Sequence, residues 1–207
     1  LKTNLSDFNY ADFDEQDEEL FSLLKEVKAK YGDLKMALVI PMTSFRQTIS
    51  NVFRNIKGLS KNMVVGPSDI SKESYDLIIV DEAHRLRQRR NLVGYKAFDD
   101  GIKRANLNPI NNDELDLIQT CCSKSILFYD PLQSIKPSDV ESSKFNGLMA
   151  LSSTRTEKLV SQFRVKGGNQ YVKLVHNIFN TVNAVKASRF GNYDFRLFDN
   201  LNEMVEQ

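Results

Sequence analysis

Short apolar runs alternate with amphipathic stretches along the chain. Each run is closed by a proline, a glycine or an aspartate, and the runs span residues 36–40, 63–65, 77–80 and 125–129. Solid apolar runs of this length are typical of strands whose two faces are both buried. We expect further short strands near residues 158–160 and 195–198.

The stretches between these runs have helical periodicity. Residues 15–31 place apolar side chains on one face and are followed by Gly32, a common helix stop. Ser44 and Gln47 have the spacing of a capping box, which predicts that a helix begins there. Strands that alternate with helices predict an α/β fold, a three-layer parallel sheet with helices on both faces. Further helices are expected near residues 114–122, 138–149 and 171–179.

Composition adds little to this picture. The 207 residues are enough for one domain, and we expect a single domain over residues 1–207. The 28 basic and 27 acidic residues nearly cancel, so a site for a polyanion has to be a local patch. The two cysteines, Cys121 and Cys122, are neighbours, which suits neither a disulfide framework nor a metal site and favours a reducing, cytoplasmic setting. No apolar run is long enough for a membrane span.

The strongest chemical signal is the run at 77–80, which is followed by Asp81, Glu82, Ala83 and His84. Ligands of an open parallel sheet bind beyond the carboxyl ends of its strands, where these two acids are expected. One carboxylate can hold Mg²⁺ between two phosphates while the other orients or deprotonates the attacking water. The alternative is a pair of ordinary solvated carboxylates, but four apolar residues before this tetrad favour the functional interpretation.

Two weaker signals follow later strands. After the run at 125–129, Asp130 is followed by Gln133, whose amide can both donate to a terminal phosphate and accept from its attacking water. Asp-Pro also begins many ordinary turns, so this signal depends on the first. Arg164 follows the strand expected at 158–160. Its guanidinium suits the charge of a transferring phosphoryl group, or a surface ion pair.

The order of these segments resembles a known family. The segments that resemble motifs Ia, II, III and IV of superfamily 1 helicases are residues 37–43, 81–84, 129–133 and 162–164. Three segments more closely resemble a bacterial helicase-like family, described as a conserved domain of unknown function and related to the helicase part of Schlafen-type proteins. They are residues 91–99, 125–140 and 161–171. The resemblance covers nearly the whole chain and implies a P-loop NTPase core of the RecA-like type.

The resemblance also implies roles for single residues. Asp81 would bind Mg²⁺, and Glu82 would activate the water that attacks ATP or GTP. Gln133 would sense the γ-phosphate, and Arg164 would act as an arginine finger in cis.

Two further parts of the site follow from the same resemblance. His84 would couple the nucleotide to the segment that contains Asp130. Pro41 and Thr43 would lie near a single-stranded nucleic acid, the partner expected for the full-length protein.

One part of the family pattern is absent. Such proteins hold phosphates with Gly-x-x-x-x-Gly-Lys-Ser/Thr, yet no glycine of this sequence is followed by lysine. We therefore expect a fragment whose P-loop precedes Leu1 and whose second motor domain follows Gln207, inactive in hydrolysis by itself. The sheet should then show a gap or an altered pairing between the strand that ends at Asp130 and the strand that leads to Arg164.

Other interpretations stay open at this point. The chain could belong to a regulatory ATPase that switches without separating strands, or form a non-enzymatic interaction module in which the acidic pair is a relic. The arginines that follow the tetrad could contact nucleic acid phosphates or form a solvated loop face. They are Arg85, Arg87, Arg89 and Arg90.

Overall fold

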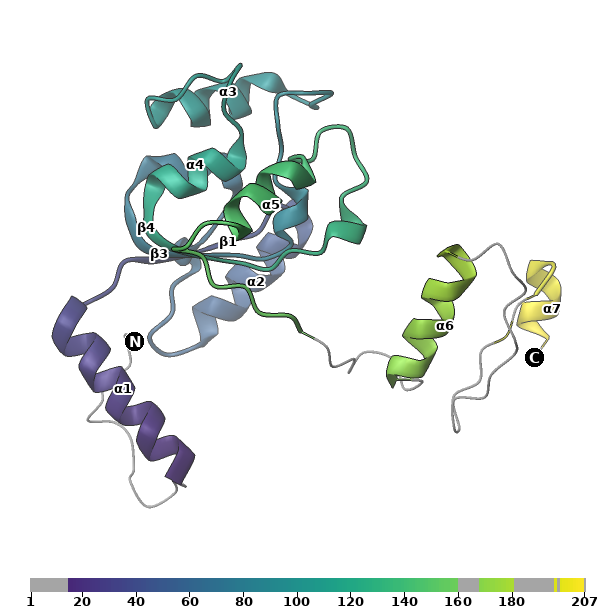
Figure 1. Ribbon diagram of the computed structural model, residues 1–207, viewed down its shortest axis with the longest axis horizontal. Helices are drawn as coiled ribbons and strands as arrows, with labels where there is room; N and C mark the ends of the chain where they lie inside the picture. The colour runs from purple at the N-terminus through teal and green to yellow at the C-terminus, as the bar shows by residue number, and fades with distance from the viewer. Residues whose placement is uncertain (1–14, 160–167, 181–195, 197, 207) are drawn as a thin grey trace. The chain divides into compact units, whose positions relative to one another are not determined.

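The computed structural model describes residues 15–159, 168–180, 196 and 198–206 (Figure 1). The chain divides into two compact units, Leu1–Leu151 and Ser152–Gln207. Within its described residues, the second unit contains the helices α6 (Gly168–Asn180) and α7 (Leu201–Val205). The expectation of a single domain over the whole chain stays a prediction.

A parallel sheet of four strands organises the first unit. Its order is β2–β1–β3–β4, and the strands are β1 (Met36–Val39), β2 (Val64–Val65), β3 (Tyr75–Val80) and β4 (Cys122–Leu127). Val80 lies opposite Val39 on one side and opposite Leu127 on the other. The carboxyl ends of β1, β3 and β4 therefore meet at one edge of the sheet, and the α/β class with a parallel sheet is confirmed.

Helices connect the strands. Figure 1 shows α4 and α5 on one side of the sheet and α2 on the other. The α-helices of this unit are α1 (Glu15–Tyr31), α2 (Thr43–Asn55), α3 (Tyr95–Arg104), α4 (Glu114–Cys121) and α5 (Ser142–Met149). The short 3-10 helices are η3 (Lys61–Met63), η4 (Pro67–Lys72), η5 (Ala83–Arg85) and η6 (Pro131–Gln133). In the part of the chain that the structure describes, no helix combines the length and apolarity that a membrane crossing needs.

The hydrophobic core joins the strands to α3, α4 and α5. β1 and β3 contribute alternate residues, and Ile78 and Val80 have no exposed surface. Phe98 of α3, Leu117 of α4 and Phe145 of α5 pack into the same cluster. On the other side of the sheet, α2 buries none of its residues completely. The segment that follows β3 is therefore anchored mainly by the α3–α5 side.

The two central strands match the sequence expectation, whereas β4 does not. The apolar run at 125–129 predicted a strand buried on both faces, but β4 begins at Cys122, residues 123–126 are exposed, and Ile126 is 47% exposed. Among the described residues β4 pairs only with β3, so it lies at an edge of the sheet. The expected gap beside this edge stays a prediction, because residues 154–159 form no strand and the segment 160–167 lies outside the described residues.

Two predicted helix starts are wrong. α2 begins at Thr43 and its N-cap is Met42, which makes no side-chain cap hydrogen bond. Ser44 therefore lies inside the first turn, where it cannot cap the helix with Gln47. α5 begins at Ser142 rather than near 138 because residues 138–140 pair with the segment after β3. The strand expected at 195–198 falls partly outside the described residues, and residues 196 and 198 are not in a strand.

Candidate functional site at the carboxyl edge of the sheet

Asp81 and Glu82 form a sharp turn directly after β3. The Asp81 N–H donates to the Val39 carbonyl at 3.1 Å, so the turn is still fixed to β1. Glu82 adopts a left-handed conformation (φ 53°, ψ 48°), and its N–H donates to Asp81 Oδ1 at 3.1 Å. Residues other than glycine are uncommon in this conformation, which costs them roughly 1–3 kcal/mol. Such residues occur preferentially at functional sites. The strained turn therefore marks the two acids as candidate functional residues.

His84 connects the acidic turn to the end of β4. Its ring is 2% exposed, and Nδ1 accepts the Asp130 N–H at 3.4 Å. Its Nε2 lies 3.0 Å from Glu82 Oε2, although this contact is not aligned as a hydrogen bond. Because Nδ1 is an acceptor, the proton of a neutral ring is assigned to Nε2, facing the carboxylate. Arg85 Nε lies 3.8 Å from the same Glu82 oxygen.

Gln133 is held against Asp130 in the turn that follows β4. One Asp130 carboxylate oxygen accepts the Leu132 N–H at 3.0 Å and thereby caps η6, and the other accepts Gln133 Nε2 at 2.8 Å. The Ala83 N–H donates to the Phe128 carbonyl at 2.8 Å, which joins the two turns through the backbone. The structure therefore brings this turn together with the acidic turn after β3.

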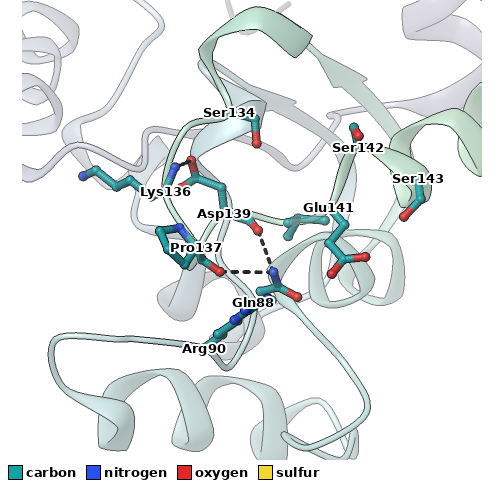
Figure 2. A pocket seen from close by; sticks show the side chains of 10 residues that line it. Gln88, Arg90, Ser134, Lys136, Pro137, Asp139, Glu141, Ser142 and Ser143 are labelled. Atoms are coloured by element: carbon teal, nitrogen blue, oxygen red, sulfur yellow. Dashed lines mark hydrogen bonds between the residues drawn. The ribbon is translucent and has the colours of Figure 1, made fainter.

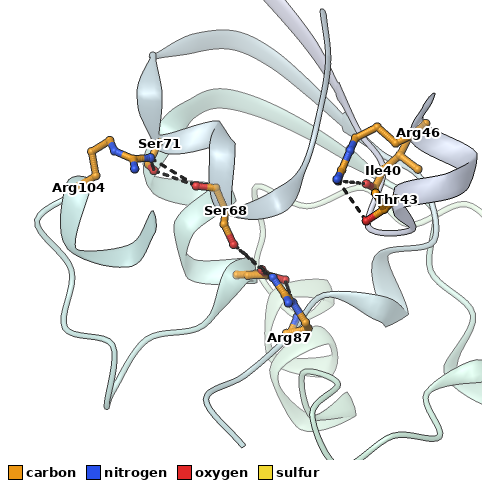
Figure 3. A network of polar contacts seen from close by, with 8 residues as sticks. Ile40, Thr43, Arg46, Ser68, Ser71, Arg87 and Arg104 are labelled. Atoms are coloured by element: carbon orange, nitrogen blue, oxygen red, sulfur yellow. Dashed lines mark hydrogen bonds and ion pairs between the residues drawn. The ribbon is translucent and has the colours of Figure 1, made fainter. Parts of the chain in front are cut away.

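Pro41 and Thr43 lie at the end of β1, where a single arginine holds the loop. Arg46 Nη1 donates to the Ile40 carbonyl at 3.0 Å, and Nη2 donates to Thr43 Oγ1 at 3.4 Å (Figure 3). Thr43 is exposed and Pro41 is partly exposed, so both are accessible to a ligand. Arg164, the expected arginine finger, lies outside the described residues.

The sequence interpretation missed a buried ion pair next to the site. Glu114, the first residue of α4, is fully buried and accepts hydrogen bonds from the backbone N–H, Nε and Nη2 of Arg87. Ser68 Oγ also donates to Glu114, at 3.1 Å. Figure 3 shows Ser68 directed toward Arg87, whose Nη2 donates to the same hydroxyl at 3.2 Å. Burial alone would lower the pKa of the Arg87 guanidinium, but the hydrogen bond and charge of Glu114 outweigh it and raise that pKa. No sequence signal pairs these residues, because 27 positions separate them.

The four arginines after the tetrad are not one uniform basic patch. Arg85 lies near Glu82, Arg87 pairs with Glu114, and Arg89 pairs with Asp99 at 2.8 Å. Arg90 makes no ion pair with any described residue. The sequence interpretation of a solvated loop face is therefore wrong for Arg87, whose partner Glu114 is buried, whereas Arg89 and Arg90 are exposed as that interpretation expects.

The segments that leave the two turns pair with each other. Residues 86–88 follow the acidic turn, and residues 138–140 follow the turn after β4. The Gln88 N–H donates to the Ser138 carbonyl and the Val140 N–H donates to the Leu86 carbonyl, both at 2.8 Å. Arg87 and Asp139 form an antiparallel bridge between them. We call this pairing the loop ladder, and it joins the two turns in addition to the contacts of Ala83 and His84.

Comparison with known proteins assigns a family to this arrangement. A family model described as "Schlafen group 3, DNA/RNA helicase domain" matches residues 18–207. The chain belongs to this family. No curated protein and no solved structure matches the chain. The match covers nearly all of the chain, in agreement with the resemblance to the Schlafen-type helicases.

In this Schlafen-type helicase domain the acids of the candidate site are spread over two turns, one after β3 and one after β4. Within the described residues, no group of three or more histidine, cysteine or acidic side chains is arranged to hold a metal ion. Tyr129, beside Asp130, stacks on Phe145 with ring centroids 4.0 Å apart. Burial, together with the Asp130 charge, raises the pKa of the Tyr129 phenol, so the hydroxyl stays protonated near neutral pH. Tyr129 therefore packs the second turn against α5 through a neutral ring.

Proposed function

We propose that this helicase domain belongs to an NTPase that uses Mg²⁺ and ATP or GTP to act on DNA or RNA. The observation that carries the proposal is the connection of two strand ends through His84, which touches Glu82 with Nε2 and the Asp130 N–H with Nδ1. Nucleotide phosphates of open parallel sheets bind beyond such strand ends. The family match supports the nucleic acid side of the proposal.

Asp81 fits the role of a magnesium ligand. Its Oδ1 accepts the Glu82 N–H, while its other carboxylate oxygen accepts no hydrogen bond from a described residue. Mg²⁺ in nucleotide sites is usually held by one or two protein carboxylates, with phosphates and waters as the other ligands. A single carboxylate is therefore compatible with the absence of a metal-binding cluster among the described residues. When bound, Mg²⁺ would neutralise charge on the phosphates.

Glu82 is the residue that we assign to the attacking water. Its side chain is 26% exposed, His84 and Arg85 lie beside one carboxylate oxygen, and we propose that the other oxygen accepts from water. Gln133 donates to Asp130 through its nitrogen, which leaves its amide oxygen for the water and its second N–H for a terminal phosphate. We propose that Arg164 stabilises the developing phosphoryl charge.

Two parts of the proposed NTPase have to come from residues other than these. The phosphate cradle needs a Gly-Lys-Ser/Thr loop, and the sequence contains no Gly-Lys pair. Strand separation needs a second motor domain, so nucleotide-dependent switching without unwinding is the alternative within the same proposal. Stimulation of hydrolysis by nucleic acid separates the two. A cytoplasmic location stays a prediction from the neighbouring cysteines.

The test is Glu82→Gln in the protein chain that carries the phosphate loop. We expect magnesium-dependent hydrolysis to fall by about 10²–10⁴-fold, the usual contribution of a general base, while nucleotide binding is retained. Glu26→Gln, which alters an exposed glutamate of α1, is the matched control and should leave the rate unchanged. Unchanged hydrolysis in Glu82→Gln, or a full-length chain without any such loop, would contradict the proposal.

A further inference from the structure

Two buried donors face the Glu82 carboxylate without forming a hydrogen bond to it. His84 Nε2 lies 3.0 Å and Arg85 Nε lies 3.8 Å from the same oxygen, Oε2. Both nitrogens are buried, and neither has a hydrogen-bond partner among the described residues. Buried donors are almost always paired in folded proteins, so an unpaired one calls for an explanation such as a functional role. The two donors indicate a second arrangement of the carboxylate, in which a hydrogen bond to it is formed.

Arg85 is matched to Glu82 by charge. In the part of the chain that the structure describes, Glu82 is the only carboxylate with which Arg85 forms an ion pair. Two later arginines of the same segment pair with acids on α4 and α3 instead. The Arg85 side chain is 27% exposed, so its charge is screened less than that of a fully exposed arginine. A guanidinium and a carboxylate in such a setting form short, charge-assisted hydrogen bonds when their geometry allows it.

The backbone fixes Arg85 close to Glu82. The Arg85 N–H donates to the Glu82 carbonyl at 2.8 Å, within the 3-10 helix η5. The next residue, Leu86, closes this helix by donating to the Ala83 carbonyl at 3.1 Å and has no exposed surface. The origin of the Arg85 side chain is therefore held in place relative to the glutamate that it faces.

The segment that follows Arg85 is anchored as well. The Gln88 side chain points to the opposite segment of the loop ladder, where its Nε2 donates to the Asp139 carbonyl at 2.9 Å and the Pro137 carbonyl at 3.2 Å (Figure 2). Its backbone N–H donates to the Ser138 carbonyl at 2.8 Å. Because the backbone is fixed on both sides of Arg85, the 3.8 Å gap to Glu82 closes by rotation of side chains and not by displacement of the chain.

Arg85 is better able than His84 to follow the carboxylate. The His84 ring is 2% exposed, and its Nδ1 accepts the Asp130 N–H at 3.4 Å, so both its packing and its other nitrogen hold it still. Arg85 has a long, flexible side chain that is partly exposed. Hydrogen bonds of catalytic groups are often long or poorly aligned without substrate and tighten when it binds.

We propose that Arg85 is a positioning residue for Glu82. When the nucleotide binds, the Arg85 Nε–H turns onto Glu82 Oε2, and the fixed carboxylate presents its other oxygen to the attacking water. The inference rests on the proposed function, which assigns this water to Glu82. Direct contact with a nucleotide phosphate is the other use of the same guanidinium. Positioning is preferred because Nε is buried beside Glu82.

The experiment measures kcat and KM for magnesium-dependent hydrolysis, and the affinity for a fluorescent nucleotide, in the protein chain that carries the phosphate loop. Arg85→Ala should lower kcat by roughly 10–100-fold, the loss that misplacement of a catalytic group by about 1 Å can cause. KM and nucleotide affinity should stay within about twofold of wild type, because the lost interaction acts on the transition state. Arg85→Lys, which keeps the charge, should recover part of kcat. Arg90→Ala, which removes an exposed arginine of the same segment, is the matched control and should change none of these quantities.

A double-mutant cycle tests whether Arg85 acts through Glu82. In a Glu82→Gln chain, Arg85→Ala should lower the remaining rate by less than about twofold, because the carboxylate that it positions is already gone. An equal fold-loss in the Glu82→Gln and wild-type backgrounds would show that Arg85 acts independently of Glu82 and would refute the inference.

The other outcomes separate this inference from the function on which it rests. An unchanged kcat in Arg85→Ala, together with loss of hydrolysis in Glu82→Gln, would overturn the inference alone. Weaker nucleotide affinity with an unchanged kcat would assign the guanidinium to a phosphate and also overturn it. Hydrolysis that survives Glu82→Gln, or is absent from the wild-type protein, would overturn the proposed function and the inference together.

Discussion

Arg87 Nη2 lies 2.6 Å from Glu114 Oε1, and the Glu114 side chain has no exposed surface. The pair ties the loop after the acidic turn to the first residue of α4, and the hydroxyl of Ser68 connects both to η4. A buried carboxylate is stable only when its charge is paired and its oxygens accept hydrogen bonds. The position of the loop ladder therefore depends on this ion pair.

Removal of the arginine should destabilise the fold strongly. Arg87→Ala leaves the Glu114 charge buried, and breaking such a pair costs about 3–5 kcal/mol, reduced here because Arg87 is one-third exposed. Urea unfolding measures the loss. Arg90→Ala, which removes an arginine without an ion pair to the described residues, should change stability by less than about 0.5 kcal/mol. Adding Glu114→Gln to Arg87→Ala should recover part of the loss, and a fully additive double mutant would contradict the assignment.

His84 should be needed for the connection between the two turns. His84→Ala leaves the Asp130 N–H without its acceptor and should cost roughly 1–3 kcal/mol in the free energy of unfolding. His84→Asn should cost less, because its amide oxygen can replace Nδ1 as the acceptor. Thermal or urea unfolding of both variants tests this. Equal losses in the two variants would show that ring packing, rather than the hydrogen bond, is what the residue contributes.

The sequence predicted the central strands and the placement of the acids well, because both follow from local patterns. The apolar run at 77–80, bounded by polar residues and rich in isoleucine and valine, favours a strand, and Asp81 and Glu82 directly follow its end. The same reasoning placed Asp130 after β4. Their proximity then follows from the parallel pairing of β3 with β4, which alternating strands and helices favour.

The parts that the sequence did not predict depend on tertiary contacts. The start of α2 was misassigned because Ser44 and Gln47 have the right spacing, while the loop before α2 is in fact held by Arg46 on the Ile40 carbonyl. The start of α5 was misassigned because pairing with residues 86–88 overrides helical propensity at 138–140. Exposure of β4 depends on which strand lies at the edge, and local hydrophobicity does not encode that.

Cys122 should react slowly with alkylating reagents. Burial, with a smaller contribution from Cys121, raises the pKa of its thiol from 9.0 to about 11. Because only the thiolate reacts, two pKa units correspond to a roughly 100-fold slower reaction at pH 8 than for an unperturbed thiol. Between pH 9 and about 11 the folded chain retains a proton that the unfolded chain loses, so stability should fall as pH rises. Iodoacetamide labelling of Cys121→Ser against pH tests this, and a midpoint near 9 would contradict it.

Gly66 should matter because the Arg46 guanidinium lies where a side chain would begin. A Cβ at Gly66 would clash with Arg46 Nη1, so Gly66→Ala has to displace the group that holds the Ile40 carbonyl and Thr43. Gly66 has a φ of −86°, so the substitution adds no backbone strain. We expect a stability loss of about 1 kcal/mol, the net value of one hydrogen bond, and a similar loss in Arg46→Ala.

Gly147→Ala on α5 is the control, since its Cβ meets nothing within 4 Å, and it should be neutral or stabilising by up to about 1 kcal/mol. If the loop at Pro41 and Thr43 contacts nucleic acid, Gly66→Ala should also weaken oligonucleotide binding while Gly147→Ala leaves it unchanged. Equal behaviour of the two alanine variants in unfolding and in binding would show that Arg46 does not position this loop.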